Sequence, residues 1–323
     1  MRLLEIKTDK RLIIFFANFA HGSGTSLSSA QLAAKALREL EDEDVQVLNA
    51  LERSITRFES IPFPILQKLT GLSRGKLLFR LGRLNAFGFV KKSERGYNLL
   101  SSGLDALALR FFVKQNLISG MGRSIGMGKE SDVFEVVSDS GTRSVIKFYR
   151  IGRISFRATR IKRAYSDPTS QLQWLAINID AARKESEGLK MAIAAGVRTP
   201  KLVARDRHAV LMEEIEGVML HNCRKGDLEN PLKLEKDIFL NVRKAYTGPG
   251  MVNGDLSEYN ILFDGSDPWI IDWPQYVLKD HPNADELLSH DVGNILLFFA
   301  KRFGSKLDND RVLKYTKGES QDI

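Results

Sequence analysis

Three polar side chains in the last quarter of the chain have types and spacing that suit phosphoryl transfer. Asp255 and Asn260 stand five residues apart in a polar loop within residues 251–263, and the loop leads into an apolar strand. Asp272 follows another short apolar stretch. An aspartate can orient or accept the proton of an attacking hydroxyl, while an amide oxygen and a carboxylate can hold Mg²⁺. We therefore expect Asp255 to be catalytic and Asn260 and Asp272 to be metal ligands.

A glycine-bearing turn and a lysine lie upstream of these residues. Gly126 and Gly128 allow a strand-to-strand turn to approach phosphate groups closely, because neither residue has a Cβ. Lys147 follows roughly twenty residues later on an apolar strand, the place from which a lysine can contact ATP phosphates. Alone, such a pair of glycines is more often part of a plain hairpin turn, and a lysine on a strand more often faces solvent. Their order ahead of Asp255 nevertheless indicates nucleotide binding. The expected contacts of the turn are Gly126, Met127, Gly128, Lys129, Glu130, Ser131 and Val133.

Two segments between the lysine and the polar loop could complete a nucleotide site. Glu185 lies on a helix ahead of an apolar face and is the expected partner of Lys147, with Glu187 as the fallback. Residues 209–215 read as a strand that ends in acids and would run along the adenine. Met212, Glu213 and Ile215 are the expected contacts, with backbone groups of Glu213 and Ile215 at the edge of the base.

The elements in front of this region follow the order helix, turn, helix and β-hairpin, which is typical of a winged helix. Leu77, Leu81 and Leu84 share one helix face and should contact the core, and Ser73 is a suitable N-cap. Helices are expected over residues 28–40, 44–57, 64–70, 73–85 and 104–115, strands over 89–92 and 97–100, and a glycine-bearing linker over 120–124.

The second helix of the pair carries a row of cations one residue ahead of its leucines. Lys76, Arg80 and Arg83 form this basic ridge, Arg74 begins it, and wing residues could extend it. The ridge could contact nucleic-acid phosphates, or it could be a solvated face in a domain that binds protein. We saw no aromatic residue on the ridge, so contact with the sugar-phosphate backbone is preferred over base stacking. The predicted nucleic-acid contacts are Arg74, Lys76, Arg80, Arg83, Lys91 and Lys92.

The composition is that of a globular protein with room for more than one core. The chain has 323 residues, a net charge of +8 and a single cysteine, so it can form no intramolecular disulfide. Residues 12–20 superficially resemble a signal peptide, but the acidic residues ahead of them do not suit one. We expect no membrane span, a cytoplasmic location and a monomer. The basic charge is compatible with a polyanionic partner.

The motifs together resemble the RIO family of atypical protein kinases, and the preceding winged helix resembles that of its Rio2 branch. The resemblance rests on the segments 128–131, 254–260, 271–275, 281–286 and 291–295. It implies an α+β chain with a winged helix followed by a bilobal kinase-like domain. The expected domains are an extension over 1–30, a winged helix over 31–118 and a RIO domain over 119–323, with lobes 119–215 and 216–323.

The resemblance implies a serine/threonine protein kinase or a switch-like ATPase that uses ATP and Mg²⁺, with Mn²⁺ as a possible substitute. It implies that Asp272 is phosphorylated transiently, which makes this residue catalytic as well as metal-binding. It also implies a role in maturation of the small ribosomal subunit through binding to its rRNA-containing precursor. Asn253 departs from the family pattern, which usually has His there, and we expect activity to survive the change.

Residues 150–163 are strongly basic, and the resemblance implies autophosphorylation nearby, at Ser155, Thr159 or Ser166. Two alternative functions stay open. One is a small-molecule phosphotransferase of the aminoglycoside type, which shares the loop from Asp255 to Asn260. The other is a catalytically weak rRNA-binding assembly factor that senses ATP.

Overall fold

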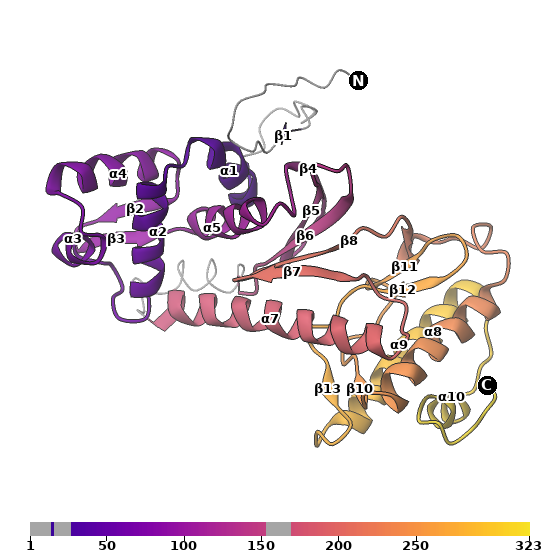
Figure 1. Cartoon of the computed structure of the whole chain (residues 1–323). Helices are drawn as coiled ribbons and strands as arrows, with labels where there is room; N and C mark the ends of the chain where they lie inside the picture. Colours follow the sequence, from indigo (N-terminus) through magenta and orange to yellow (C-terminus); the bar gives the residue numbers. More distant parts are fainter. Residues whose placement is uncertain (1–13, 16–26, 153–168) are drawn as a thin grey trace. The chain divides into compact units, whose positions relative to one another are not determined.

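The structure, a computed structural model, describes residues 14–15, 27–152 and 169–323, and for residues 14–15 and 169–173 it describes the backbone alone. The chain forms two compact units, Met1–Ile179 with Asp206–Ala209 and Asp180–Arg205 with Val210–Ile323. The expected α+β class is confirmed by the mixture of helices and sheets (Figure 1). The expected domain boundaries stay a prediction.

The first unit begins with a helical part that has the predicted winged-helix order. Its elements are α1 (Ser29–Ala36), η1 (Leu37–Glu39), α2 (Asp42–Ser54), α3 (Phe63–Thr70), α4 (Arg74–Ala86), β2 (Val90–Ser93), β3 (Gly96–Leu99) and α5 (Ser101–Lys114). Gly71 ends α3 with a left-handed φ of 65°, and the Ser73 hydroxyl accepts a hydrogen bond from the Lys76 amide and caps α4. The predicted core leucines of α4 are all buried.

Antiparallel strands follow α5 in the same unit. β4 (Gly120–Met127) pairs with β5 (Ser131–Val137), β5 pairs with β6 (Arg143–Tyr149), and β1 (Ile14–Phe15) runs parallel to β4. The prediction of a linker over 120–124 is wrong, since these residues begin β4. The register of β4 shifts on both sides of Ser124, and a Cβ on Gly122 would lie 3.3 Å from the Cβ of Glu135. Glycines in this strand therefore accommodate a close neighbour and an irregular ladder rather than a flexible link.

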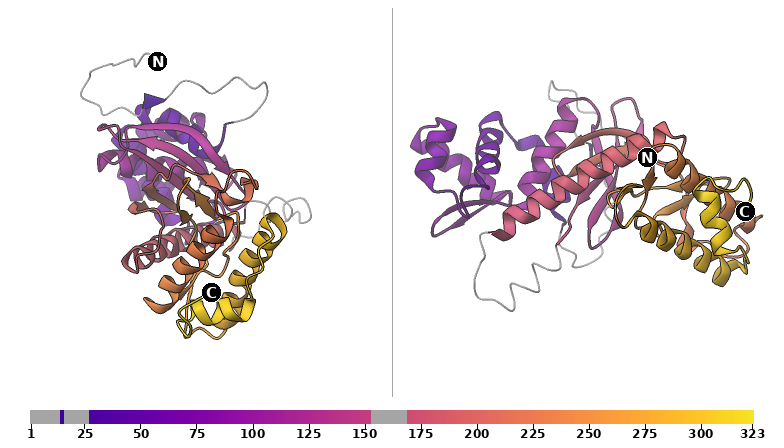
Figure 2. Two further views of the ribbon diagram at one scale, coloured as in Figure 1. Left: turned by 90° about the vertical axis from the view of Figure 1, so that its right-hand side faces the viewer. Right: turned by 90° about the horizontal axis from the view of Figure 1, so that it is seen from below.

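The second unit combines short strands with long helices. Its elements, three of which (α7, β7 and β8) reach into the first unit, are α7 (Thr169–Ala194), β7 (Leu202–Asp206), β8 (Ala209–Glu213), β9 (Val218–Met219), η2 (Leu220–Asn222), α8 (Pro231–Thr247), β10 (Met251–Val252), β11 (Ile261–Phe263), β12 (Pro268–Ile270), β13 (Val277–Leu278), α9 (Ala284–Phe303) and α10 (Asn309–Thr316). β11 pairs with β12 and β9, and β10 pairs with β13. Helices α8 and α9 pack side by side (Figures 1 and 2) and bury Phe239, Ile295 and Phe299.

Several expectations concern residues that the structure does not describe. Most of the expected extension over 1–30, the apolar stretch 12–20 and the proposed phosphorylation sites Ser155, Thr159 and Ser166 lie outside the described residues. Within the described part of the chain, every helix is too short or too polar to cross a bilayer.

Candidate active site

The polar loop after β10 is held in place by a glycine and a buried acid. Gly254 has a φ of 82°, and a Cβ there would lie 2.9 Å from the carbonyl oxygen of Gln275, so the backbone path requires glycine. The amides of Gly254 and Leu256 each donate to the carboxylate of Asp291, both at 2.8 Å. Asp255 lies between these two anchored residues with an exposed side chain. The loop therefore presents one accessible carboxylate on a fixed backbone.

The hairpin of β11 and β12 brings Asn260 next to the segment that carries Asp272. Ile261 lies opposite Ile270, and the carbonyl of Asn260 accepts a hydrogen bond from the Ile271 amide at 2.9 Å. The Asn260 side chain donates to the carbonyl of Asp255 at 2.6 Å and accepts from the Ser257 amide at 2.9 Å. The antiparallel register thus collects at one end of the hairpin the three residues that the spacing predicted to act together.

Asn253 ties the two loops to each other. Its side-chain nitrogen donates to the carbonyl of Asp272 at 2.7 Å, and its side-chain oxygen accepts from the Asp255 amide at 3.2 Å. Residue 253 therefore supports the backbone of the loop. An asparagine can do this because one amide group provides both a donor and an acceptor.

Asp291 is a site residue to which sequence reasoning gave no role. It is 1% exposed, and burial raises its pKa to about 6, although the two amide donors and the nearby charge of His290 act in the opposite direction. An acid on the apolar face of a helix was the available signal in the sequence. Its partners could not be identified, because they lie 35 and 37 residues earlier in the chain.

The helix α7 distinguishes the two predicted glutamates. Glu185 is fully buried, and its carboxylate accepts a hydrogen bond from the amide of Trp273, next to Asp272, at 2.7 Å. Glu187 instead forms an exposed ion pair with Arg183 at 2.8 Å. The geometry favours Glu185 over Glu187 as the functional acid, while its pairing with Lys147 stays a prediction.

The predicted phosphate turn lies in the first unit, between β4 and β5. The Gly128 amide donates to the carbonyl of Ser131 at 2.9 Å and closes the turn, and residues 127–130 are exposed. Lys147 lies opposite Val133 in the β5–β6 ladder. Its side chain is 7% exposed and its Nζ lies 4.9 Å from the centre of the Tyr149 ring, so the alternative of a solvent-facing lysine is excluded.

The strand predicted to follow the adenine is β8, which ends at Glu213. Met212 is buried. The Glu213 amide donates to the carbonyl of Lys201 at 2.9 Å, so this amide is engaged in pairing and is not available to a base. A contact from the backbone of Glu213 would therefore have to use its carbonyl, and this contact stays a prediction. The contacts expected from Met212 and from the backbone of Ile215 stay a prediction.

The basic ridge of α4 contacts acids at the start of α2. Lys76 pairs with Glu43 at 3.0 Å, and Arg80 pairs with Glu41 and Glu43 at 2.8 Å. Arg83 also contacts Glu41. Hydrogen bonds from Arg80 and Arg83 lower the pKa of Glu41 to about 2. The nucleic-acid contacts stay a prediction. The ion pairs with Glu41 and Glu43 argue against phosphate binding by the ridge, because its positive charges already have acidic partners.

A second observation on α4 was missed in the sequence. Phe79 is 60% exposed, and the guanidinium groups of Arg80 and Arg83 lie 5.3 and 6.0 Å from the centre of its ring. The preference for backbone contact over base stacking assumed that the ridge has no aromatic residue, and this assumption was wrong because Phe79 lies beside it. The wing residues Lys91 and Lys92 are exposed, as is Arg74.

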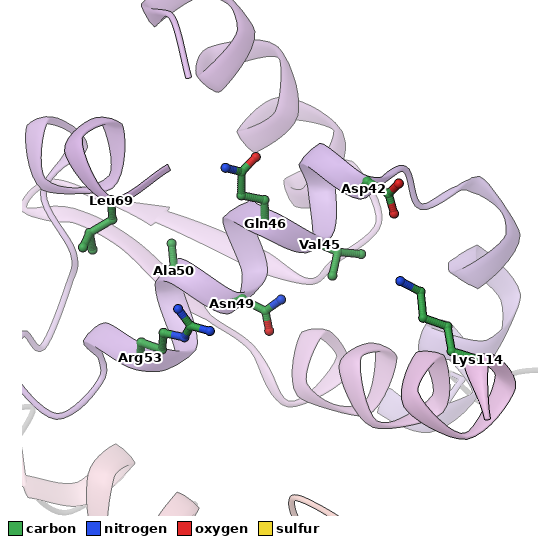
Figure 3. Close-up of a pocket in the computed structure, with 8 residues that line it drawn as sticks. All are labelled: Asp42, Val45, Gln46, Asn49, Ala50, Arg53, Leu69 and Lys114. Atoms are coloured by element: carbon green, nitrogen blue, oxygen red, sulfur yellow. The ribbon is translucent and has the colours of Figure 1, made fainter. Parts of the chain in front are cut away.

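The winged-helix part also contains a pocket of about 440 Å³ (Figure 3). Its lining residues come from α2, α3 and α5 and are Asp42, Val45, Gln46, Asn49, Ala50, Arg53, Leu69 and Lys114. The Gln46 side chain donates to the carbonyl of Thr70 at 2.7 Å, and Asp42 pairs with Arg110, so two polar lining groups are already engaged in the fold.

Sequence comparison places both parts of the chain among known proteins. Residues 132–312 match the family described as the RIO domain, and residues 37–115 match the family described as Rio2, N-terminal. The chain is 35% identical over 268 residues to the RIO-type serine/threonine-protein kinase Rio2 of Methanocaldococcus jannaschii, a match that covers 80% of this chain and 97% of that protein. It is 29% identical over 301 residues to the serine/threonine-protein kinase RIO2 of Saccharomyces cerevisiae, which covers 89% of this chain and 70% of that protein.

Structural comparison agrees with these matches. The Rio2 kinase–ADP/Mg²⁺–phosphoaspartate complex from Chaetomium thermophilum superimposes with a TM-score of 0.76 at 30% identity, covering 89% of this chain and 90% of that chain. The expected order of a winged helix followed by a kinase-like domain is thereby confirmed. Both families match this chain, the Methanocaldococcus jannaschii protein is similar over 97% of its length, and the solved Rio2 kinase has a similar fold. The chain therefore belongs to the RIO domain family and, within it, to the Rio2 branch.

Proposed function

We propose that the chain binds ATP with magnesium and transfers the γ-phosphoryl group, as a serine/threonine protein kinase or a switch-like ATPase. The observation that carries the proposal is a network of hydrogen bonds from the side-chain amides of Asn253 and Asn260, which joins the backbones of Asp255 and Asp272 to each other and to the Asn260 side chain. Positioning is the main contribution that a protein makes to phosphoryl transfer. The kinase names of the relatives and the ADP in the solved complex support the same reaction.

Each residue has a distinct part in this reaction. Asp255, exposed on an anchored loop, accepts the proton of the acceptor hydroxyl. Lys147 pairs with ATP phosphates, Glu185 orients Lys147, and the turn at 126–131 covers the phosphates. Met212, the carbonyl of Glu213 and the backbone of Ile215 contact the adenine.

The residues that would hold magnesium fit that ion. The donation from the Asn260 amide nitrogen to Asp255 orients the amide oxygen, and this oxygen keeps a second lone pair besides the one used by Ser257. Asp272 supplies a carboxylate. Hard oxygen ligands of this kind suit Mg²⁺, which also keeps waters and phosphate oxygens. When bound, the ion neutralises developing charge on the phosphates; Mn²⁺ is a possible substitute, since it accepts the same ligands.

Asp272 is also the proposed acceptor in the switch-like reaction. Its carboxylate oxygen attacks the γ-phosphorus, the bond to the β-phosphate oxygen breaks and ADP leaves. Water then hydrolyses the acyl phosphate to phosphate and restores the carboxylate. The phosphoaspartate of the solved Rio2 complex supports this step.

We also propose that the protein acts in the cytoplasm on precursors of the small ribosomal subunit, as a monomer outside that particle. Support comes from its place in the Rio2 branch and from the net charge of +8. Arg74, Lys91 and Lys92 are exposed and could contact rRNA while the ion pairs of Lys76, Arg80 and Arg83 stay intact.

Turnover of ATP by the purified chain, with and without Asp255→Ala, tests the proposal. We expect the substitution to lower turnover roughly 100- to 10,000-fold while ATP still binds. Asp280→Asn, which removes another exposed carboxylate, should leave turnover unchanged. Turnover only with a small alcohol or amine would favour the small-molecule phosphotransferase, and ATP binding without turnover would favour the ATP-sensing assembly factor. Salt-sensitive binding to purified precursor particles tests the ribosomal role.

A further inference from the structure

A buried cluster of charged side chains joins the winged-helix part of the first unit to its sheet. Asp105 on α5 receives a two-pronged contact from Arg150, with nitrogen-to-oxygen distances of 2.9 and 2.7 Å. The Nε of Arg150 donates to Asp132 on β5 at 3.0 Å. His208 Nε2 lies 2.7 Å from Asp105 and 3.0 Å from Arg150. The cluster therefore connects chain segments 45 and 103 residues apart.

The cluster is isolated from solvent. Arg150 is 1% exposed, and Asp105, Asp132 and His208 are fully buried. Burial alone would raise the pKa of Asp105, but the charge of Arg150 and the hydrogen bonds from His208 and Arg150 outweigh it and lower the pKa to about 2. Buried charges of this kind hold their partners in one geometry, because each contact that is lost leaves a charge without water or counter-ion.

Arg150 is connected directly to the turn expected to cover the phosphates. Its amide donates to the carbonyl of Glu130 at 2.5 Å, and its guanidinium holds Asp132, the residue that follows Ser131. Arg150 also follows β6 by one residue, three positions after Lys147. One residue thus holds the C-terminal end of the turn, through its backbone amide and its guanidinium, at the end of the strand that carries the phosphate-binding lysine.

We propose that Asp105, a winged-helix residue, is a positioning residue for nucleotide binding that acts through Arg150 on the turn at 126–131. The hydrogen bonds of the Asp105 side chain go to Arg150 and His208, which lie outside the turn. Its two-pronged contact fixes the plane of the Arg150 guanidinium, which in turn sets where Asp132, the residue after the turn, lies. This inference rests on the proposed function, since it assumes that the turn binds ATP.

The substitution Asp105→Asn tests the proposal with little change in volume. The asparagine can accept only one of the two guanidinium bonds, while Arg150 keeps Asp132 as its counter-ion, so the charge is not left unpaired. We expect the Kd for ATP to rise roughly ten-fold, the effect of losing one charge-assisted hydrogen bond. Amide hydrogen exchange of residues 126–131 should become faster in the nucleotide-free protein, while kcat at saturating ATP changes less than the Kd.

Glu52→Gln is the matched control. Glu52 on α2 pairs with Arg207 at 2.6 Å, so the substitution weakens another contact between the helical part and the 206–209 turn without reaching Arg150. We expect ATP affinity and exchange of 126–131 to stay within about two-fold of the unsubstituted chain. Equal effects of Asp105→Asn and Glu52→Gln would overturn the proposal, since they would indicate general loosening of the unit.

Arg150→Lys provides a second variant if Asp105→Asn fails to fold. It keeps the charge but cannot form the planar two-pronged contact, so faster exchange of the turn is again expected. Unchanged exchange at 126–131 in a folded variant contradicts the positioning role. Failure of the unsubstituted chain to bind ATP would instead contradict the proposed function, and the exchange measurement without nucleotide separates the two outcomes.

Discussion

The side-chain nitrogen of Asn253 donates to the backbone carbonyl of Asp272 at 2.7 Å, across 19 residues of sequence. The other end of the same amide accepts from Asp255. One neutral side chain thus holds the catalytic loop against the loop that carries the phosphoacceptor proposed here. The usual His of the family and this Asn can serve the same purpose, because both combine a donor and an acceptor in one planar group.

Asn253→Ala should lower turnover more than ATP binding. The substitution leaves the carbonyl of Asp272 and the amide of Asp255 without this partner, so we expect a roughly ten-fold loss of kcat, the effect of one or two neutral hydrogen bonds. Steady-state turnover and ATP titration measure the two quantities. Asn253→His is the matched control and should retain most of the rate. Full activity of the alanine variant would show that the link is dispensable.

Asp291 should make the folded chain less stable as the pH rises from 4 to 7. Its pKa is about 6 in the folded chain, above the ordinary value of 3.8, so its stabilising effect is fully present below pH 3.8 and is lost as the pH rises through 6. The free energy of unfolding of the unsubstituted chain, relative to Asp291→Asn, should therefore fall by roughly 3 kcal/mol between pH 4 and 7. Denaturant titrations at several pH values measure this difference.

Asp264→Asn is the control for that series. Hydrogen bonds from Asp267, Trp269 and Ser266 outweigh the effect of burial and lower the pKa of Asp264 to about 2. Its stabilising effect is lost only as the pH falls through that value, so the difference between this variant and the unsubstituted chain should be constant from pH 5 to 7. A constant difference for Asp291→Asn as well would contradict the first expectation.

Removing the acids that pair with the α4 ridge should strengthen binding of nucleic acid. In the double variant Glu41→Gln and Glu43→Gln, Arg80 loses its two closest partners, so more of the ridge charge becomes available to phosphates. We expect tighter binding of a structured RNA and a steeper dependence on salt, by about one unit of slope for each added phosphate contact. Binding titrations at several salt concentrations provide both values.

Lys91→Ala with Lys92→Ala is the complementary variant. These wing cations are exposed, so their loss should weaken binding and reduce the salt slope even while the ridge remains paired. If the first double variant binds RNA no better than the unsubstituted chain, the ridge is a structural contact of α4 with α2 and not a concealed nucleic-acid surface.

The sequence by itself determined the features that depend on neighbours along the chain. The leucine face of α4, its Ser73 cap and the hairpin after it followed from periodicity and turn chemistry, which act over a few residues. The spacing of Asp255 and Asn260 and the place of Asp272 likewise indicated phosphoryl transfer, because the polypeptide between them is too short to offer many arrangements.

Tertiary structure alone decided which distant groups meet. Asp291 could not be paired with the amides of Gly254 and Leu256 from sequence, nor the ridge with Glu41 and Glu43, because a charged side chain has many candidate partners until the backbone is folded. The same reason explains Asp105, a buried acid in a helix of the winged-helix part whose partner Arg150 lies 45 residues away. Local patterns specify which groups are available, and only packing specifies which of them are desolvated together.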